Sequence, residues 1–285
     1  MFGLTGSITS SLNTLRAQRV YRANAESLAR TYAQMATGTR INRGYDDPAG
    51  LIASQSLAQT LAALDAETAA NERASNQATT ADGALAQVSD LLIEAKGLVN
   101  ANANTAGLSP EEKAANQLSI DSIVSTVNRL SATTRSGGQK LLDGTATLSA
   151  SGKSFAIDSA AATNLGQTTV AGTAYTLADL ATGKPLATTG PSAATAAEVV
   201  DQAINDVATQ RAQLGSFDQN TLQTRTRSIA ASRVQLLSAV SMLRDTDYAL
   251  AATQRSRSTV LQYASLAALT QSLGRRRIGT FSISG

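Results

Sequence analysis

Two series of residues that repeat every seven positions constrain the fold of this chain of 285 residues most strongly. A strict seven-residue repeat is typical of left-handed coiled coils, because a straight helix would drift away from a seam of that period. One series lies in residues 48–100 and the other in residues 193–243, so we expect a very long helix in each half. The series are Leu57, Leu64, Asn71, Ala78, Leu85, Leu92 and Val99, and then Val200, Val207 and Leu214 followed, after a one-residue skip, by Leu222, Ile229, Leu236 and Leu243.

The two long helices are predicted to pair side by side, which makes the middle of the chain the tip of a hairpin. Asn71 is the polar member of the first series. A buried asparagine at such a position can fix the register of a coiled coil, whereas an asparagine that faces solvent or a small cavity has no such role. The residue pattern leaves both interpretations of Asn71 open.

Shorter helices and a region of strands complete the expected fold. Residues 8–36 form the first helix and residues 247–273 the last, each with an apolar face. A further helix begins after Ser109, where a proline and two glutamates form a helix start, and it runs to about Thr134. Residues 141–192 are rich in Gly, Ser, Thr and Ala, so we expect short strands and hairpins there. The apolar members are Tyr21, Ala25, Leu28, Tyr32 and Met35 in the first helix, and Val260, Leu261, Ala264, Ala268, Leu269 and Leu273 in the last.

Several short fragments define the limits of these elements. Residues 100–109 are a predicted turn, and residues 136–139 are predicted to end the helix that follows it. Fragments at 147–150 and 154–158 are the expected strands, and residues 177–181 are a candidate helical turn. The predicted fold is mostly α: an elongated antiparallel coiled-coil bundle of the N- and C-terminal halves, with a small β-hairpin region in the middle of the chain.

A break between the first helix and the long one combines a helix stop with a helix start. Gly38 can adopt the left-handed conformation that ends a helix. Asp47 before Pro48 has the form of an N-cap followed by proline at the first helical position. Asp46 and Asp47 also place negative charge at the positive end of the new helix.

Composition excludes several classes of site. The chain has no cysteine and no histidine, which removes disulfides, thiolate ligands, the commonest general base and the commonest zinc ligand. No run approaches the ~20 apolar residues that span a bilayer. The first residues lack the basic and apolar regions of a secretory signal peptide, so we expect that any export uses another route.

Charge is distributed unevenly along the chain. Residues 1–44 and 246–285 together hold 11 Lys/Arg and 2 Asp/Glu, whereas residues 45–245 have a net charge of −6. Basic ends with an acidic middle can indicate contact with nucleic acid or membrane. We favour two structural layers of opposite charge, because no aromatic residues interleave the basic ones as single-strand binding requires.

The stretch 40–50, Arg-Ile-Asn-Arg-Gly-Tyr-Asp-Asp-Pro-Ala-Gly, resembles the signature of bacterial flagellins. The resemblance continues upstream in residues 11–19, downstream in Asp-Gly-Ala-Leu at 82–85, and near the other end in Leu-Arg-Asp-Thr-Asp-Tyr-Ala at 243–249. It covers most of the chain. It implies that the terminal helices pair as an inner domain lining the channel of a filament, and that the long helices form the next shell.

Mapped onto this sequence, the inner domain is 1–44 with 246–285, and the outer helical domain is 45–245 with 141–192 as its β part. The short insert implies that the large outer domains of many flagellins are absent. Linker residues are expected to tie the two domains together, and the apolar faces of the terminal helices to build the inner tube. The expected assembly residues are Leu12, Leu15, Leu28, Tyr32, Arg40, Asn42, Asp46, Asp47, Asp245, Asp247, Leu261, Ala264 and Leu269.

The resemblance also implies the partners and the location. It implies a homopolymeric helical filament with a flagellar cap, junction proteins and an export chaperone as further partners, and no cofactor, nucleic acid or membrane insertion. The expected location is the flagellum outside the cell, after export without a cleaved signal peptide. In flagellins seen by Toll-like receptor 5, an arginine aligns with Glu94 here, so this charge reversal implies weak or no recognition.

One departure from the family lies at the end of the chain, where three arginines occupy 275–277. If the last helix ends at Leu273, two interpretations of these arginines are open. They line a basic channel or form a salt bridge between subunits, or they belong to a solvated tail.

Other functions compete with that of a filament subunit. A hook–filament junction protein shares the linker motif and the paired terminal helices, but the Asp-Thr-Asp-Tyr-Ala stretch resembles flagellin more. A metallopeptidase insert needs histidine, which the chain lacks. Asp46 and Asp47 could in principle act as a catalytic carboxylate pair, but they lie at a helix cap, so we expect no enzymatic activity. A secreted adhesin or translocator with a coiled-coil core is disfavoured by the signature motifs.

Overall fold

The computed structural model describes residues 2–103, 107–150, 152–187 and 193–281, with side chains between 12 and 271. The chain divides into two compact units. We call Met1–Ala62 with Arg233–Gly285 the terminal unit and Ala63–Ser232 the central unit.

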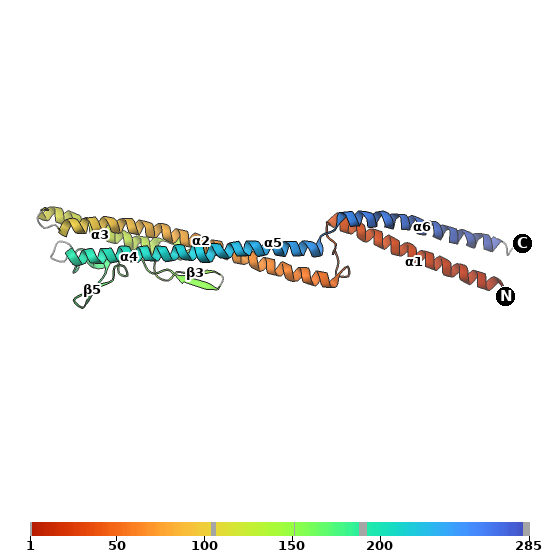
Figure 1. Ribbon diagram of the computed structural model, residues 1–285, viewed down its shortest axis with the longest axis horizontal. Helices are drawn as coiled ribbons and strands as arrows, with labels where there is room; N and C mark the ends of the chain where they lie inside the picture. Colours follow the sequence, from red (N-terminus) through yellow and green to blue (C-terminus); the bar gives the residue numbers. More distant parts are fainter. Residues whose placement is uncertain (1, 104–106, 151, 188–192, 282–285) are drawn as a thin grey trace. The chain divides into compact units, whose positions relative to one another are not determined.

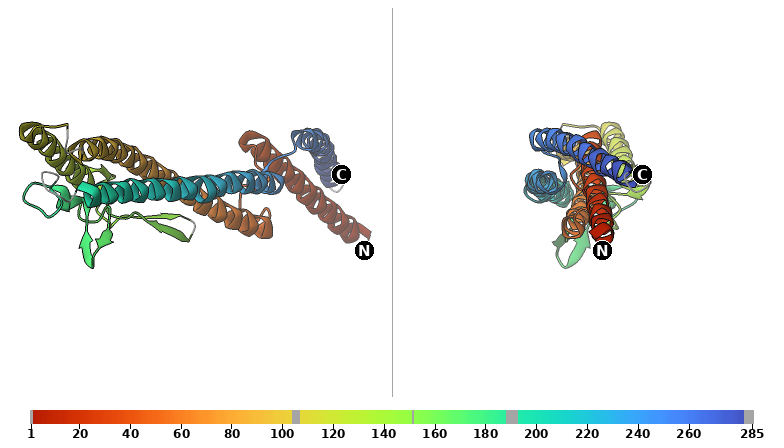
Figure 2. Two further views of the ribbon diagram at one scale, coloured as in Figure 1. Left: turned by 60° about the vertical axis from the view of Figure 1, so that its left-hand side comes forward. Right: turned by 90° about the vertical axis from the view of Figure 1, so that its right-hand side faces the viewer.

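In the terminal unit, the helices α1 (Phe2–Thr37) and α6 (Tyr248–Phe281) lie side by side and antiparallel (Figures 1 and 2). Both are longer than expected, because α1 begins before residue 8 and α6 does not end at Leu273. A single glycine costs only about 1 kcal/mol inside a helix, and arginine is a good helix former, so Gly274 followed by three arginines continues α6. The side chains of these arginines lie outside the described residues.

Small and polar side chains line the seam between α1 and α6. The residues buried there are Thr14 and Thr31 on α1 and Ala251, Ser258 and Ser265 on α6. Cα atoms of the two helices approach within 8 Å of one another along this seam, and small side chains fill the contact. The expected apolar faces are therefore only partly buried, which the sequence pattern did not indicate: Tyr32 is 52% exposed and Val260 66% exposed.

In the central unit, α2 (Pro48–Ala103), α3 (Pro110–Thr133) and α4 (Ala193–Phe217) run alongside one another (Figure 1). The helix α2 extends a few residues into the predicted turn at 100–109. Every member of its seven-residue series from Asn71 onward is buried. A second series, offset by three positions, is buried with it and consists of Ala74, Ala81, Val88, Ala95 and Asn102. The core contains Leu85, Leu92 and Val99 of α2, Ile120 and Val127 of α3, and Val200, Val207 and Leu214 of α4.

The one-residue skip in the second series corresponds to a segment of π-helix, η2 (Asp218–Gln223), between α4 and α5 (Thr224–Arg244). A π turn accommodates one extra residue in a helix. Leu214, Leu222 and Ile229 are consequently all buried, although the first two are eight positions apart. The predicted long helix at 193–243 is confirmed, with this interruption.

The helix α3 begins with the predicted cap. Ser109 accepts a hydrogen bond from the N–H of Glu112 at 3.2 Å, and the Glu112 carboxylate accepts one from the N–H of Ser109 at 2.8 Å. These hydrogen bonds hold the pKa of Glu112 below its ordinary value. Residues 136–139 do more than end the helix, because Gly137 and Gly138 have positive φ and form the turn of a hairpin, β1 (Arg135–Ser136) with β2 (Gln139–Lys140).

The middle of the chain forms two further hairpins along one side of the helices (Figures 1 and 2). The strands β3 (Thr147–Ala150) and β4 (Lys153–Ala156) pair antiparallel, as do β5 (Thr168–Val170) and β6 (Thr173–Tyr175). The candidate helical turn is the 3-10 helix η1 (Leu177–Leu180). We call residues 135–187 the insert.

Polar side chains of the helices anchor the insert through its backbone. On α3, the Gln117 amide donates to the carbonyl of Leu180 at 2.7 Å, and the Asn128 Oδ1 accepts from the N–H of Ala162 at 2.9 Å. On α4, the Asp206 carboxylate accepts from the N–H of Gly166 at 2.9 Å. Two further anchors are Ser131 to the carbonyl of Leu142 and Gln210 to the carbonyl of Asp158.

Ion pairs join α2 to the opposite helices within the central unit. Arg225 of α5 binds Glu67 through two hydrogen bonds of 2.7 and 2.9 Å, and Arg211 of α4 binds Asp82 at 2.8 Å. The hydrogen bonds from the arginines to these carboxylates raise the pKa of both guanidinium groups. All these side chains are partly exposed, so the pairs favour one register more than they add stability.

Candidate assembly site

The predicted site residues fall into two parts of the terminal unit. One part is the linker, which we define as residues 38–47 with residues 243–248. The other is the exposed surface of the two terminal helices.

The linker ends one helix and starts the next as predicted. Gly38 has a φ of +70°, so it adopts the left-handed conformation that stops α1. The Asp47 Oδ1 accepts a hydrogen bond of 2.8 Å from the N–H of Gly50 and caps α2. A side chain at position 50 would overlap this carboxylate and lie 2.8 Å from Cδ1 of the buried Ile41. Glycine is therefore required at position 50 for the cap to form.

Asp46 and Asn42 shape the loop between these helices. The Asp46 Oδ2 accepts hydrogen bonds from the N–H groups of Asn42 at 3.1 Å and Arg43 at 2.8 Å. The Asn42 Oδ1 accepts from the hydroxyl of Thr39 at 2.5 Å, and its Nδ2 donates to the Thr39 carbonyl at 3.1 Å. These bonds satisfy backbone groups that the helices leave unpaired, so both side chains have a structural function.

The two parts of the linker are joined by backbone hydrogen bonds. The N–H of Arg40 donates to the carbonyl of Arg244 at 2.6 Å, and the N–H of Thr246 donates to the carbonyl of Gly38 at 2.9 Å. The Arg40 Nη2 also donates to the carbonyl of Leu243 at 2.8 Å. Arg40 thus acts on the backbone of the distant segment, more than 200 positions away in sequence. Its ion pair with Asp47 is longer, at 3.6 Å, and contributes little because both side chains are partly exposed.

Asp245 and Asp247 have different functions in the linker. The Asp247 Oδ1 accepts from the N–H of Leu250 at 3.0 Å and caps α6. The Asp245 carboxylate accepts from the hydroxyl of Ser241, at the end of α5. The structure thus brings together the six predicted linker residues, Arg40, Asn42, Asp46, Asp47, Asp245 and Asp247.

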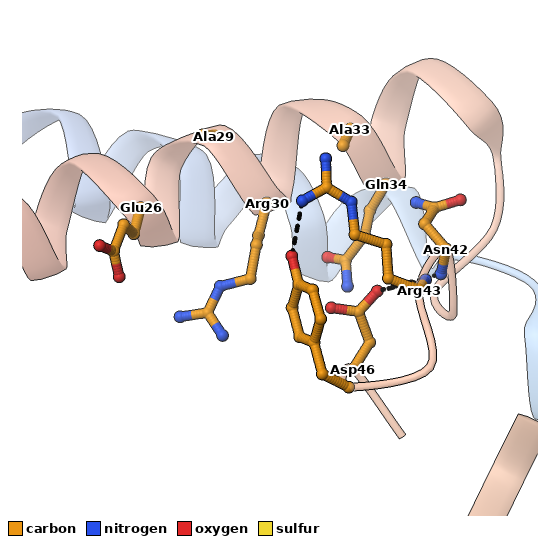
Figure 3. Close-up of a pocket in the computed structure, with 9 residues that line it drawn as sticks. Glu26, Ala29, Arg30, Ala33, Gln34, Asn42, Arg43 and Asp46 are labelled. Atoms are coloured by element: carbon orange, nitrogen blue, oxygen red, sulfur yellow. Dashed lines mark hydrogen bonds between the residues drawn. The ribbon is translucent and has the colours of Figure 1, made fainter. Parts of the chain in front are cut away.

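A shallow groove of about 350 Å³ lies where the linker meets α1. Figure 3 shows Glu26 and Arg30 projecting from α1, with Arg43 and Asp46 coming from the linker. The Arg43 guanidinium donates to the hydroxyl of Tyr45 at 2.8 Å. The groove offers charged groups of both signs beside an exposed aromatic ring, which suits contact with polar side chains of another protein surface.

The exposed surface of α1 and α6 carries most of the other predicted site residues. Leu12 is 48% exposed, Leu15 50% and Leu261 44%. Tyr32 and Ala264 are also exposed, whereas Leu28 and Leu269 are half-buried beside the seam. Because the seam is filled by small residues, the large apolar side chains point away from it and remain available for other contacts.

Sequence reasoning missed the residues that hold the terminal helices together. The Asn24 Nδ2 donates to the carbonyl of Leu261 at 3.2 Å, and the hydroxyls of Ser27 and Ser258 lie 3.4 Å apart. Near the linker, the hydroxyl of Tyr248 donates to the carbonyl of Met35 at 3.3 Å. The recurrence of Ala251, Ser258 and Ser265 every seven residues is the signal that could have revealed this seam.

The described residues were also searched for metal-ligand groups and for helices that could span a membrane. Among the described residues, no group of three or more acidic, histidine or cysteine side chains could hold a metal ion. Within the same ranges, no helix combines the length and the apolar character needed to cross a membrane.

Comparison with known families matches both halves of the chain. The model of the bacterial flagellin N-terminal helical region matches residues 8–147, and that of the bacterial flagellin C-terminal helical region matches residues 197–273. Together the two regions include all of α2, α3 and α5 and most of α1, α4 and α6.

Known relatives agree with these matches. The chain is 29% identical to the flagellin of Bacillus subtilis, covering 92% of this chain and 93% of that protein. It is 33% identical to the B-type flagellin of Pseudomonas aeruginosa over 48% of this chain, but that match spans only 28% of the relative's length. A crystal structure of Bacillus cereus flagellin matches 55% of this chain and 86% of the other, with 21% identity and a TM-score of 0.42. On the two family regions, this chain belongs to the bacterial flagellin family.

Proposed function

We propose that this chain is a structural subunit that polymerises into the bacterial flagellar filament for motility. One observation carries the proposal: the two family regions include most of α1 and α6, whose large apolar side chains are exposed in the single chain. Burial of a leucine stabilises by about 1.5–3 kcal/mol, so covering these side chains with neighbouring copies favours assembly. A non-closing contact between identical copies generates a helical filament.

The linker supports this function by fixing where the terminal helices leave the long ones. The proposed inner domain is 1–44 with 246–285, and the proposed outer domain is 45–245 with 141–192 as its β part. The compact units of the single chain divide elsewhere, after Ala62 and before Arg233. We propose that the predicted boundary describes the layers of the filament, because the hydrogen bonds of Arg40, Asp46 and Asp47 define the exit points of the helices.

The proposed partners are further copies of the chain, the flagellar cap, the junction proteins and an export chaperone. We propose export without a cleaved signal peptide to the flagellum outside the cell, and no catalytic activity. The junction protein remains the less favoured alternative, because the relatives named above are flagellins.

Weak or no recognition by Toll-like receptor 5 is a separate part of the proposal. Glu94 is exposed on α2, and the family resemblance aligns it with an arginine of the recognised flagellins. A reversed charge at a receptor contact opposes binding. In a reporter-cell assay with purified monomer, Glu94→Arg should increase the response, and a potent response to the unchanged protein would refute this part.

Seeded polymerisation tests the main proposal. Purified monomer is mixed with short filament fragments and examined by electron microscopy. Long filaments that grow from the fragments are the expected result. Absence of growth, or binding only at the ends of isolated hooks, would favour the junction protein.

A further inference from the structure

The hairpin of β1 and β2 carries two positive charges directly opposite one another. Arg135 is the cross-strand partner of Lys140, and we call these two residues the hairpin pair. Their neighbours Thr134 and Leu141 are joined by a backbone hydrogen bond of 3.1 Å. Alternate pairs of an antiparallel ladder are hydrogen-bonded, so the hairpin pair is a non-hydrogen-bonded pair, whose side chains lie closer together. Like charges in this arrangement are destabilising.

The rest of the described chain offsets only part of this positive charge. Hydrogen bonds from Thr145 and, to a smaller extent, the charge of Lys140 hold the pKa of Asp143 below its ordinary value. Asp143 therefore attracts Lys140, although its carboxylate is already bound by Thr145. Arg135 is exposed and forms no ion pair with another described side chain. The hairpin thus presents an excess of positive charge to its surroundings.

The helix α2 carries the opposite arrangement. Asp90 and Glu94, which we call the helix pair, lie four positions apart and are both exposed. Residues at this spacing are neighbours on one face of a helix, and like charges there are destabilising. The hydrogen bond to Asp82 and, to a smaller extent, the charge of Asp90 raise the pKa of Arg211, so Asp90 is partly offset. Glu94 forms no ion pair within the described part of the chain.

The two pairs match in spacing as well as in charge. Cβ atoms four residues apart on a helix are separated by about 5–6 Å, and those of an opposed strand pair by about 4.5–5.5 Å. Two anions can therefore face two cations at nearly equal separations. No ion pair joins the hairpin pair to the helix pair within the single chain, where all four side chains are described.

We propose that the hairpin pair binds the helix pair of a second copy of this chain. The inference rests on the proposed filament and names one of its contacts. A second copy is the partner because the chain itself carries the complementary surface, so that each unfavourable pair of like charges is relieved by the other. The two surfaces are different, which makes the contact heterologous. A heterologous contact that does not close on itself continues from copy to copy.

The first test reverses the charge of each pair separately. Asp90→Lys with Glu94→Lys makes both surfaces basic, and Arg135→Glu with Lys140→Glu makes both acidic. Each variant keeps a pair of like charges at the altered site, so the urea midpoint of its monomer should stay nearly unchanged. Seeded elongation of either variant alone should be at least about tenfold slower than that of the unchanged protein, because like charges then meet across the contact.

An equimolar mixture of the two variants identifies the contact. In the mixture each variant finds the opposite charge on a neighbour of the other kind, so elongation should return close to the rate of the unchanged protein. Mixing cannot restore a charge pair that forms within one chain. The matched control is Lys153→Glu with Lys184→Glu, which changes the net charge equally at two exposed positions of the insert and should leave elongation unchanged.

Three results would overturn the proposal. They are reversed variants that elongate as fast as the unchanged protein, a mixture that stays as slow as its components, and a control that is slowed as much as the reversed variants. Failure of the unchanged protein to elongate would instead refute the proposed filament function, and this contact with it. The two failures are therefore distinguishable.

The second test needs no charge reversal. Because the chain has no cysteine, Glu94→Cys with Lys140→Cys introduces two thiols, while Asp90 and Arg135 keep one charge on each surface. In filaments, a short bismaleimide should join thiols of neighbouring copies and give a ladder of dimers, trimers and larger products in denaturing electrophoresis. One thiol per chain gives nothing larger than a dimer, so each single variant is a control. Filaments of the double variant that give no ladder would overturn the proposal.

Discussion

The core of the central unit and the seam between the terminal helices are built from different residues. In the central unit, Leu85, Leu92 and Ile120 are fully buried among three helices and the insert. Between α1 and α6, the buried residues are serines, threonines and an alanine, and the leucines are exposed. Burial of apolar surface is the main favourable term in folding. The central unit therefore buries its large apolar side chains within the single chain, whereas those of the terminal pair stay exposed there, and we propose that neighbouring copies cover them.

This difference follows from the distance between the helices. A close helix pair needs small side chains at the contact, and hydroxyls there satisfy one another, as Ser27 and Ser258 do. The large apolar residues are then displaced to the outer faces. We propose that these outer faces, whose exposure is unfavourable in a single chain, form the contact surface of the polymer.

The largest expected effect comes from a leucine truncation in the central core. Leu92→Ala should lower the free energy of unfolding by about 2–5 kcal/mol, because it leaves a cavity between α2 and its neighbours. The same change at the exposed Leu261 should alter it by no more than about 0.5 kcal/mol. Urea denaturation followed by circular dichroism measures both, and equal losses would break the comparison.

Removal of the exposed apolar groups should affect assembly instead of folding. The double variant Leu12→Ser and Leu15→Ser should leave the urea midpoint of the monomer nearly unchanged. Each side chain forfeits up to about 1.5–3 kcal/mol of burial in the polymer, so the critical concentration should rise at least tenfold. Sedimentation of seeded filaments measures it, and an unchanged critical concentration would remove Leu12 and Leu15 from the assembly site.

A smaller effect is expected at the helix cap of the linker. Asp47→Ala should lower stability by about 1 kcal/mol, because the N–H of Gly50 loses its acceptor. Asp47→Asn should retain most of the stability, because an asparagine oxygen also caps. If the asparagine variant lost as much as the alanine variant in urea denaturation, charge and not hydrogen bonding would be the important property.

The smallest effect should appear at Asp121, through which α3 holds the insert, and should depend on pH. Partial burial tends to raise the pKa of Asp121, but hydrogen bonds from Thr182 and Gln117 outweigh it and hold that pKa below its ordinary value. A carboxyl whose pKa is lowered by folding stabilises the folded state fully at a pH above its unfolded pKa of about 3.9. This stabilisation is lost as the pH falls through the folded pKa. Asp121→Asn should therefore cost less than about 1 kcal/mol at pH 7, after allowance for solvent screening.

The difference between this variant and the unchanged protein should be smaller at about pH 3 than at pH 7, because protonation of the carboxyl begins to remove its stabilising contribution below its unfolded pKa of about 3.9. Urea midpoints at the two pH values measure the difference. A difference that is undiminished in acid would assign the effect to packing and not to the carboxylate.

Local patterns in the sequence predicted the helices well, because each depends on neighbouring residues. The seven-residue series predicted the buried residues of α2 from Asn71 to Val99, and the skip before Leu222 marked the later π segment. The helix caps at Ser109 and Asp47 were predictable because they too depend only on neighbouring residues. Gly137 and Gly138 could have predicted the first hairpin, because two consecutive glycines favour a two-residue turn.

Features that depend on distance between elements were not predictable. Apolar spacing on α1 identified the face that contains Tyr32, but it did not reveal that Thr31 is the residue buried beside α6. The hydrogen bonds of Arg40 to residues 243 and 244 join segments that only the folded chain brings together. Gly50 is a further example. A side chain at this position would collide with Ile41 and with the Asp47 carboxylate, and only the folded chain shows these contacts.

The way the insert is anchored has a consequence for how this protein can vary. Gln117, Asn128 and Asp206 bind the insert through peptide groups, which are the same whatever side chain the insert carries. The exposed positions of its hairpins can therefore change in composition without loss of these attachments. Gly166 is an exception, because its φ is +70° and a side chain there would meet the backbone of Val199. The surface of the insert can therefore vary in sequence while the helices that hold it stay the same.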